Sequence, residues 1–182
     1  DTNGPNLTAV LEKLDLTKGQ VKFSTSKLDF GQMGALYNIA DVTVNIADAE
    51  GFGLGTLESL SCGTPIIVTM TGGLQEQVTD GKEWFGVGIE PSSKMLIGSQ
   101  DIPYIYEDRI DKEEFISALE KIYNMSKEER TELGLKGQEH VHKNYNFNKY
   151  VVKWDQLFKE VHEKCGSWDT RKGYKAWELL EV

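Results

Sequence analysis

The stretch between residues 42 and 68 constrains the fold most, because two apolar runs enclose a glycine-rich loop and a short helical segment. The runs are Val42–Ile46 and Pro65–Val68, and the loop between them contains three glycines. Continuous apolar runs are typical of strands that are buried on both faces of a parallel sheet. A glycine loop that opens a helix presents free backbone N–H groups, which suit an anion such as phosphate. We therefore expect a βαβ unit with a ligand site at the carboxyl end of its strands.

The same alternation of apolar periods continues on both sides of this unit. We predict helices over residues 6–14, 30–40, 55–61, 74–78, 111–125, 126–145 and 146–161, and strands over residues 21–23, 42–46, 66–69 and 86–89. Asn6 or Asn3 is expected to cap the first helix, Ser126 and Glu129 to form a capping box, and Asn146 or Asn148 to start the last helix. Strands that alternate with helices favour an α/β fold, a Rossmann-like parallel sheet with flanking helices, here followed by a helical C-terminal segment. Residues 91–109 are interpreted as a loop insertion in which residues 102–106 are a candidate extended stretch.

Three loops follow predicted strands, namely Ser24–Lys27, Ala49–Gly55 and Thr71–Gly73. Because the carboxyl ends of parallel strands meet at one edge of the sheet, we expect these loops to converge on one crevice. Glu50 and Glu58 flank the central loop. An ionised carboxylate only accepts hydrogen bonds, so such a pair suits a ligand with hydroxyl groups. The predicted ligand is therefore part phosphate and part sugar.

Composition excludes several other kinds of partner. The chain has 182 residues, a net charge of −9 and a sequence pI near 4.9, which disfavours duplex nucleic acid but permits a local nucleotide site. No apolar run has the length of a membrane span, and we expect a cytoplasmic protein. Cys62 is expected to be a small buried hydrophobe without a disulfide to Cys165. We expect no metal site, since His140, His142 and His162 are interpreted as surface residues of charged helices.

The order of short motifs around the glycine loop is more specific than the loop itself. Glu-Gly-Phe-Gly and a second Glu at residues 50–58 are followed by Ser-Cys-Gly-Thr-Pro at residues 61–65 and by Thr-Gly-Gly-Leu-Gln-Glu at residues 71–76. Leu-Tyr-x-x-Ala-Asp-Val precedes them at residues 36–42. This order resembles the C-terminal, nucleotide-sugar-binding domain of GT-B glycosyltransferases of the retaining family 4 type. The resemblance is close over residues 6–90 and loose to about residue 160.

The resemblance implies a role for each matched residue. Glu50 matches a catalytic residue that contacts the donor sugar's hydroxyls, and Glu58 matches one that binds the ribose of the nucleotide. The N–H and hydroxyl of Thr56 are expected to reach phosphate, and Ser24–Lys27 is expected to frame the base. The complete implied donor site is Glu50, Gly51, Phe52, Gly53, Leu54, Thr56, Glu58, Ser24 and Thr25, with no metal.

The resemblance also implies an activity and a domain plan. The activity is transfer of a sugar, of hexosyltransferase type, from a UDP- or GDP-sugar to a glycan, lipid or protein acceptor, with retention of configuration and without a cofactor. We expect residues 1–164 to be a donor-binding domain truncated at its N-terminus, and residues 165–182 to be a tail that packs on another surface. The family's basic pair, first strand and N-terminal domain have no match here. The isolated chain is therefore expected to be inactive without an N-terminal domain or companion chain.

Other interpretations stay open at this point. The same fold could serve a nucleotide-sugar epimerase or a non-catalytic nucleotide-binding module. Glu58 could be only a first-turn acid of a helix capped by Gly55, where its negative charge would interact favourably with the helix dipole. Glu50 could be a solvated loop acid, Phe52 could be a plug beneath the loop, and Glu76 could brace the loop instead of binding a ligand.

Overall fold

The computed structural model describes residues 4–172 of the chain. The chain divides into two compact units, with the boundary between Met33 and Gly34. The predicted division at residue 164 stays a prediction. The first unit contains α1 (Leu7–Lys13), which begins at Asn6 as predicted, because the Asn6 side chain accepts a hydrogen bond from the N–H of Ala9 at 3.1 Å.

The predicted strand at residues 21–23 is wrong. The backbone is irregular there, and Val21 and Phe23 are 38% and 52% exposed. A strand requires ladder hydrogen bonds to a neighbour, and three alternating residues carry no information about a partner. The next predicted element is observed as α2 (Phe30–Ile39), which crosses the boundary between the two units.

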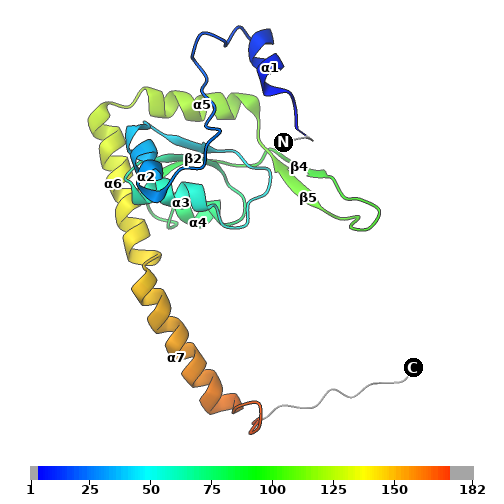
Figure 1. Ribbon diagram of the computed structural model, residues 1–182, viewed down its shortest axis with the longest axis vertical. Helices are drawn as coiled ribbons and strands as arrows, with labels where there is room; N and C mark the ends of the chain where they lie inside the picture. The colour runs from blue at the N-terminus through cyan, green and yellow to red at the C-terminus, as the bar shows by residue number, and fades with distance from the viewer. Residues whose placement is uncertain (1–3, 173–182) are drawn as a thin grey trace. The chain divides into compact units, whose positions relative to one another are not determined.

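The second unit is built on a parallel sheet, which confirms the predicted α/β class. Its strands are β1 (Thr43–Asn45), β2 (Ile66–Thr69) and β3 (Gly86–Ile89), in the order β1-β2-β3. The helices α3 (Leu54–Ser61) and α4 (Leu74–Val78) connect them (Figure 1). Both connections are crossovers between parallel neighbours, so the loops after β1 and β2 leave the same edge of the sheet.

The central strand β2 is completely buried, as its apolar run predicts. Ile66 and Val68 pack on one face with Leu60, Leu74 and Val141, of which Val141 lies on the later helix α6 (Lys127–Asn144). Ile67 packs on the opposite face with residues of α5 (Lys112–Tyr123). Figure 1 shows the same layers, with α5 on one side of the sheet and α3 and α4 on the other. The alternation of side chains along a strand thus supplies both cores from one segment.

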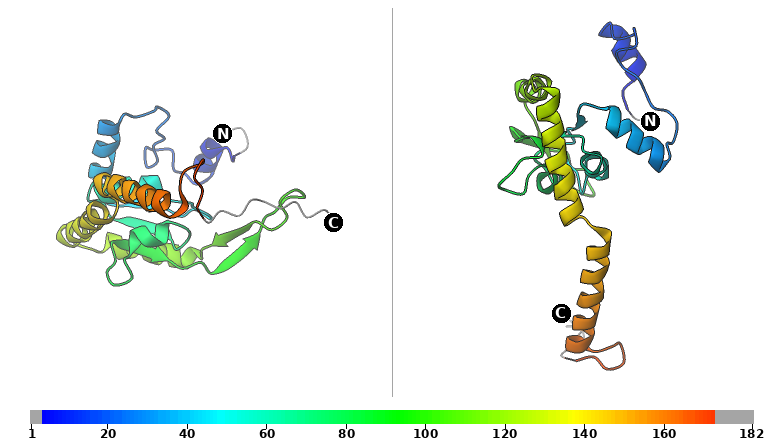
Figure 2. Two further views of the ribbon diagram at one scale, coloured as in Figure 1. Left: turned by 90° about the horizontal axis from the view of Figure 1, so that it is seen from below. Right: turned by 90° about the vertical axis from the view of Figure 1, so that its left-hand side faces the viewer.

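Two long helices follow α5. The first, α6 (Lys127–Asn144), begins with the predicted capping box, in which Ser126 and Glu129 bond each other's backbone N–H groups. The second, α7 (Phe147–Cys165), begins at Asn146 and ends at Gly166, where the backbone has a φ of 76°. Figure 2 shows α7 following α6 after a short bend between the two helices and extending away from the sheet. None of its residues is buried.

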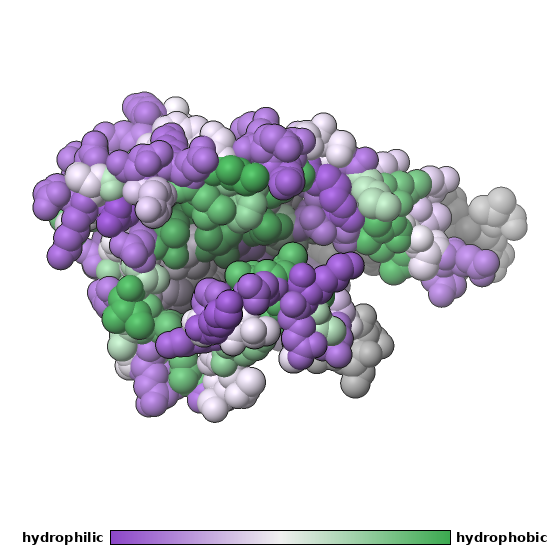
Figure 3. All heavy atoms as spheres, turned by 90° about the horizontal axis from the view of Figure 1, so that it is seen from above, coloured by the Kyte–Doolittle hydropathy of each residue, from purple (hydrophilic) through white to green (hydrophobic). Residues whose placement is uncertain are grey.

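The segment expected to be a loop insertion forms an antiparallel hairpin instead. Its strands are β4 (Ser93–Leu96) and β5 (Tyr106–Arg109). The base of the hairpin is fixed to the loop after β1, because Asp108 N–H donates to the carbonyl of Asp48 at 2.8 Å and the Arg109 guanidinium pairs with the Asp48 carboxylate at 2.9 Å. Apolar side chains gather on its surface (Figure 3), including Met95, Leu96, Ile102, Tyr104 and Tyr106. Their spacing lacks strict alternation, which is why the pattern did not predict strands.

The remaining expectations concern cysteines, membrane and tail. Cys62 and Cys165 are free thiols, and Cys62 is half-buried instead of fully buried. Among residues 4–172, no helix is both long enough and apolar enough to cross a membrane. Trp168 in the tail is 83% exposed, whereas Tyr174, Trp177 and Leu180 lie outside the described residues.

Packing of α6 against the α3–β2 turn generates a stability prediction. A Cβ atom added at Gly134 would overlap the backbone carbonyl of Gly63, which cannot move without displacing the turn. We expect Gly134→Ala to lower the free energy of unfolding by about 1–3 kcal/mol, the usual cost of overpacking. Gly34→Ala is the matched control, since that helical position has open space. Thermal unfolding followed by circular dichroism checks this, and equal midpoints for the two variants would contradict it.

Candidate functional site

The glycine loop after β1 turns into α3 at Gly53. Gly53 is the N-cap residue and has a φ of 85°, a conformation that side chains other than glycine rarely adopt. A Cβ atom there would also lie 2.5 Å from the side chain of Leu74. No side chain caps α3, so the backbone N–H groups of its first turn are available to a ligand. The helix begins one residue earlier than predicted, at Leu54.

The turn at residues 71–73 lies directly against this loop. A Cβ atom at Gly72 would overlap the carbonyl of Glu50, and one at Gly73 would lie 2.8 Å from the carbonyl oxygen of Phe52. Two of the three loops predicted to converge therefore do so. The third, Ser24–Lys27, belongs to the first unit, and its place in a site stays a prediction. Within that loop, the Ser24 hydroxyl bonds to the carbonyl of Ser26 at 3.4 Å.

Gln77 supports the glycine loop through hydrogen bonds to its backbone. The sequence suggested such a role only for the neighbouring Glu76. Gln77 is completely buried on α4. Its side-chain amide donates to the carbonyl oxygens of Phe52 and Gly53, at 2.5 and 3.2 Å. Its side-chain oxygen accepts a hydrogen bond of 2.6 Å from the hydroxyl of Thr56. A glutamine in a short helix gives no signal of such a contact, since the partners lie 21 to 25 residues away.

The expected role of the Thr56 hydroxyl requires correction. Thr56 is 1% exposed, and its hydroxyl faces the carbonyl of Gly53 at 2.8 Å as well as the side chain of Gln77. A helix directs only part of its first turn outward, and position 56 falls on the inner side. The hydroxyl therefore cannot reach a phosphate on the outer face, and only the N–H of Thr56 remains for that role.

The two carboxylates have different surroundings. Glu50 is half-buried, and its carboxylate accepts a hydrogen bond from the N–H of Phe52 at 3.3 Å. Glu58 is exposed and accepts a hydrogen bond of 3.0 Å from the hydroxyl of Tyr37. Glu58 is the fifth residue of α3, and no acid lies in the first turn of that helix. The alternative in which Glu58 serves only the helix dipole from the first turn, with Gly55 as the cap, is therefore wrong.

Tyr37 is a residue of this site that the motif did not single out. Burial raises the pKa of Tyr37 to about 12, and the hydrogen bond to Glu58 and the negative charge of Glu58 act in the same direction. The phenol therefore stays protonated and holds one carboxylate oxygen of Glu58 in a fixed direction. The other oxygen remains free to accept a hydrogen bond from a ligand.

The side chains of Phe52 and Leu54 leave the loop toward solvent. They are 46% and 67% exposed, and the Phe52 ring meets Tyr145 edge-on with centroids 6.0 Å apart. Phe52 is therefore not a plug buried under the loop. Leu54 can offer its backbone N–H to a polar ligand, whereas the N–H of Phe52 already donates to the Glu50 carboxylate.

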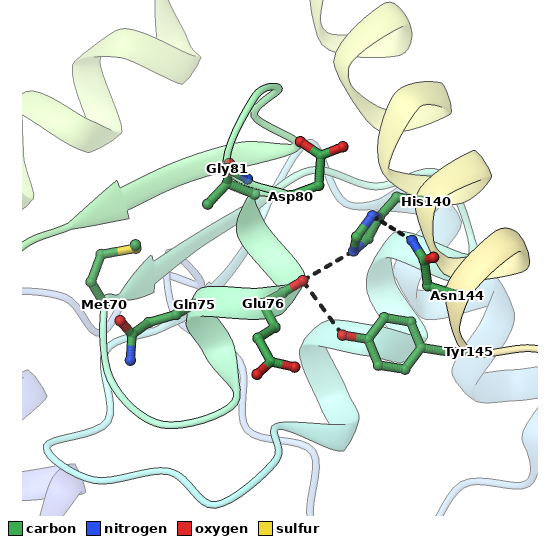
Figure 4. Close-up of a pocket in the computed structure, with 9 residues that line it drawn as sticks. Met70, Gln75, Glu76, Asp80, Gly81, His140, Asn144 and Tyr145 are labelled. Atoms are coloured by element: carbon green, nitrogen blue, oxygen red, sulfur yellow. Dashed lines mark hydrogen bonds between the residues drawn. The ribbon is translucent and has the colours of Figure 1, made fainter.

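His140 is buried, contrary to its interpretation as a surface residue. It is 9% exposed and stacks on Phe85 with ring centroids 4.3 Å apart. Its Nε2–H donates to the carbonyl of Glu76 at 3.0 Å, while the amide of Asn144 donates to Nδ1 at 3.0 Å (Figure 4). A carbonyl oxygen can only accept, so Nε2 carries a hydrogen. Gly137 explains the burial, because a Cβ atom there would lie 2.5 Å from the side chain of Leu60 on α3, so α6 approaches α3 closely.

A pocket of about 490 Å³ opens beside these residues (Figure 4). Tyr145 reaches the same carbonyl of Glu76 with its hydroxyl at 3.4 Å, so α6 holds α4 through two side chains. Glu76 therefore contributes its backbone to this contact. Within residues 4–172, no three His, Cys or carboxylate side chains come together in a group that could hold a metal ion.

Comparison with known proteins identifies the family. The model of the family described as Glycosyl transferases group 1 matches residues 10–140. The chain belongs to this family. Among curated relatives, the D-inositol 3-phosphate glycosyltransferase of Streptosporangium roseum is 51% identical over 45 residues, which are 25% of this chain and 10% of that protein. The match is thus confined to a small part of the relative.

Solved structures establish the fold. Sucrose-phosphate synthase from Thermosynechococcus elongatus matches 86% of this chain and 34% of its own, with a TM-score of 0.66 at 22% identity. HepE from Anabaena, in complex with UDP and glucose, matches 86% of this chain and 35% of its own, with a TM-score of 0.60 at 18% identity. The chain therefore spans about a third of each of these glycosyltransferase-fold structures. The predicted GT-B C-terminal domain is confirmed.

The pair formed by Tyr37 and Glu58 generates a pH-dependent prediction. A phenol whose pKa is raised on folding stabilises the fold below the ordinary pKa of 10.0, and this contribution is lost as the pH rises toward 12. We expect the wild type to unfold at a higher temperature than Tyr37→Phe below pH 10, and the difference to shrink at higher pH. Unfolding midpoints of both proteins at several alkaline pH values test this. A difference that is independent of pH would contradict it.

Proposed function

We propose that the second unit binds a nucleotide-diphosphate sugar at the loop between Glu50 and Glu58. The observation that carries the proposal is that two carboxylates, Glu50 and Glu58, flank a loop that leads into an uncapped helix start. The shape of this loop is fixed by its close contact with the Gly72–Gly73 turn. Carboxylates accept hydrogen bonds from sugar hydroxyls, and uncapped N–H groups donate to phosphate. Family membership and the fold shared with HepE, whose structure contains UDP and glucose, support the same ligand class.

Each group then has a defined task. Glu58 accepts hydrogen bonds from the ribose hydroxyls, with the phenol of Tyr37 fixing its carboxylate. Glu50 accepts hydrogen bonds from hydroxyls of the donor sugar near the reacting carbon and is the proposed catalytic residue. The N–H groups of residues 51, 53, 54 and 56 face the sugar and the diphosphate.

The reaction is transfer of the sugar to a glycan, lipid or protein acceptor, with retention of configuration. As the bond between sugar and diphosphate breaks, negative charge develops on the leaving phosphate oxygens. Fixed N–H dipoles at a helix start stabilise that charge without a metal ion and without reorganisation. We propose a UDP- or GDP-hexose donor, a cytoplasmic setting and an N-terminal domain or companion chain that supplies the acceptor site.

The nucleotide-binding role of Glu58 is tested by substitution in the full-length protein. Glu58→Gln removes one charged acceptor, and hydrogen bonds to charged groups are worth about 1.5–3 kcal/mol. We expect affinity for UDP or GDP to fall about tenfold or more by calorimetry. Glu120→Gln is the control, because Glu120 is an exposed acid on α5 and its replacement changes net charge equally.

Three outcomes separate the proposal from its rivals. Unchanged nucleotide affinity in Glu58→Gln would remove the ribose assignment. A wild type that gives no heat with UDP, GDP or their sugars would indicate a non-catalytic module without a nucleotide ligand. A rearranged sugar nucleotide formed in the absence of acceptor would indicate an epimerase.

The role of Glu50 is tested by separating the sugar from the nucleotide. Glu50→Gln keeps an oxygen that can accept from Phe52 N–H but loses the charge. We expect the affinity for the free nucleoside diphosphate to stay within about twofold, while kcat/KM for transfer from the sugar nucleotide falls about tenfold or more. Steady-state kinetics and calorimetry on the same preparation measure both. Equal losses in the two quantities would place Glu50 at the nucleotide instead of the sugar.

A further inference from the structure

We propose that Gln77 is a positioning residue that orients the backbone N–H groups of Gly53 and Leu54 toward the diphosphate of the donor. This inference rests on the proposed function, because it assigns a task within the same site. Gln77 itself has no access to a ligand, since it is completely buried beneath the loop. Its action is therefore exerted through the two peptide groups that it holds.

The hydrogen bonds of Gln77 determine which of its atoms face the loop. The carbonyl oxygens of Phe52 and Gly53 can only accept, so the group that meets them must be the NH₂ end of the amide. The opposite end then accepts from the Thr56 hydroxyl. All three contacts agree with one orientation of the amide, and the reverse orientation would set oxygen against oxygen at both carbonyls.

This orientation fixes two peptide planes. A trans peptide points its C=O and its N–H in opposite directions, and the chain contains no cis peptide bond. The carbonyl of Phe52 is held inward by Gln77, so the N–H of Gly53 in the same peptide faces outward. The carbonyl of Gly53 is also held inward, so the N–H of Leu54 faces outward. These N–H groups belong to the N-cap residue and the first residue of α3.

Flexibility at Gly53 makes such a brace necessary. Glycine samples many backbone conformations, and its φ of 85° here is one of several that it can adopt. The loop has no side-chain cap that would hold the start of α3. Without the Gln77 amide, the carbonyl of Phe52 would lose the hydrogen bond that turns the Gly53 N–H outward. The carbonyl of Gly53 would keep only its bonds from the Leu57 N–H and the Thr56 hydroxyl. Oriented dipoles act on a developing charge only if they are already in place.

Gln77 is held in position by the packing of α4, its own helix, against α6. The preceding residue, Glu76, receives hydrogen bonds on its carbonyl from His140 and Tyr145 (Figure 4). The helix α4 is thereby fixed on one side by α6, and it fixes the loop on the other side. The position of Gln77 is therefore fixed by the contact between α4 and α6, which does not involve the ligand.

The experiment compares a nucleoside diphosphate with its nucleoside in the full-length protein. UDP, GDP and ADP are titrated into the wild type by calorimetry, and the tightest of the three is carried forward with the matching nucleoside. We expect Gln77→Leu to weaken binding of the diphosphate about tenfold or more, with the affinity for the nucleoside unchanged. Gln156→Leu on the exposed surface of α7 is the control for an equivalent substitution. Equal affinities in a folded Gln77→Leu variant would overturn the proposal.

A second variant gives a readout that loss of packing would not produce. A carboxylate introduced by Gln77→Glu cannot donate to the two carbonyls, whereas the protonated carboxyl can donate to one of them. We expect the ratio of wild-type to variant affinity for the diphosphate to fall as the pH is lowered from 8 toward 5. A ratio that is independent of pH would argue against positioning by a hydrogen-bond donor.

A measurement on the wild type alone covers the case in which both variants fail to fold. In amide NMR spectra, the N–H resonances of Gly53 and Leu54 should shift on addition of the diphosphate and not of the nucleoside. If the diphosphate binds and neither resonance moves, the inference fails while the proposed function survives. If none of the three diphosphates binds the wild type, the proposed function fails first.

Discussion

The close approach of two backbone segments, Glu50–Phe52 and Gly72–Gly73, is the constraint on which the candidate site depends. Neither glycine can carry a Cβ atom, because it would overlap or crowd the carbonyl oxygens of the first segment. This contact brings α4 under the glycine loop, and only then can the amide of Gln77 reach two carbonyls there. The shape of the loop is therefore determined by a contact between two backbone segments. Such a contact can adjust less than a contact between side chains.

The sheet explains why those two segments meet. The strands β1 and β2 are parallel neighbours, so the loops that follow them start side by side. Burial of β2 on both faces holds that register, since Ile66 and Val68 belong to one core and Ile67 to the other. A shift by one residue would exchange the two sets of side chains, whose partners come from different helices. The energy that stabilises the sheet is thus also what fixes the position of the site.

Sequence patterns predicted what depends on neighbours along the chain. The apolar run of β2, the capping box at Ser126 and the helix start at Asn146 each involve residues within a few positions, and each is confirmed. The failures depend on distant partners. Burial of His140 follows from the approach of α6 to Leu60, and the inward hydroxyl of Thr56 follows from Gln77, 21 residues later. The hairpin of β4 and β5 was not predicted, because apolar and polar residues do not alternate along its strands. The strands are defined by their hydrogen-bonded pairing with each other.

Local charge, and not the net charge of −9, governs what an anionic ligand meets at this loop. A groove of about 880 Å³ runs from Phe52 and Leu57 along the junction of α6 and α7, and the lysines Lys143, Lys149 and Lys153 line it. Salt screens exposed charges beyond about 8 Å at physiological ionic strength, so acids elsewhere on the chain contribute little at the loop. The three lysines line the same groove as Phe52, a residue of the glycine loop. The lysines match the phosphate of the proposed ligand, and the carboxylates match its hydroxyl groups.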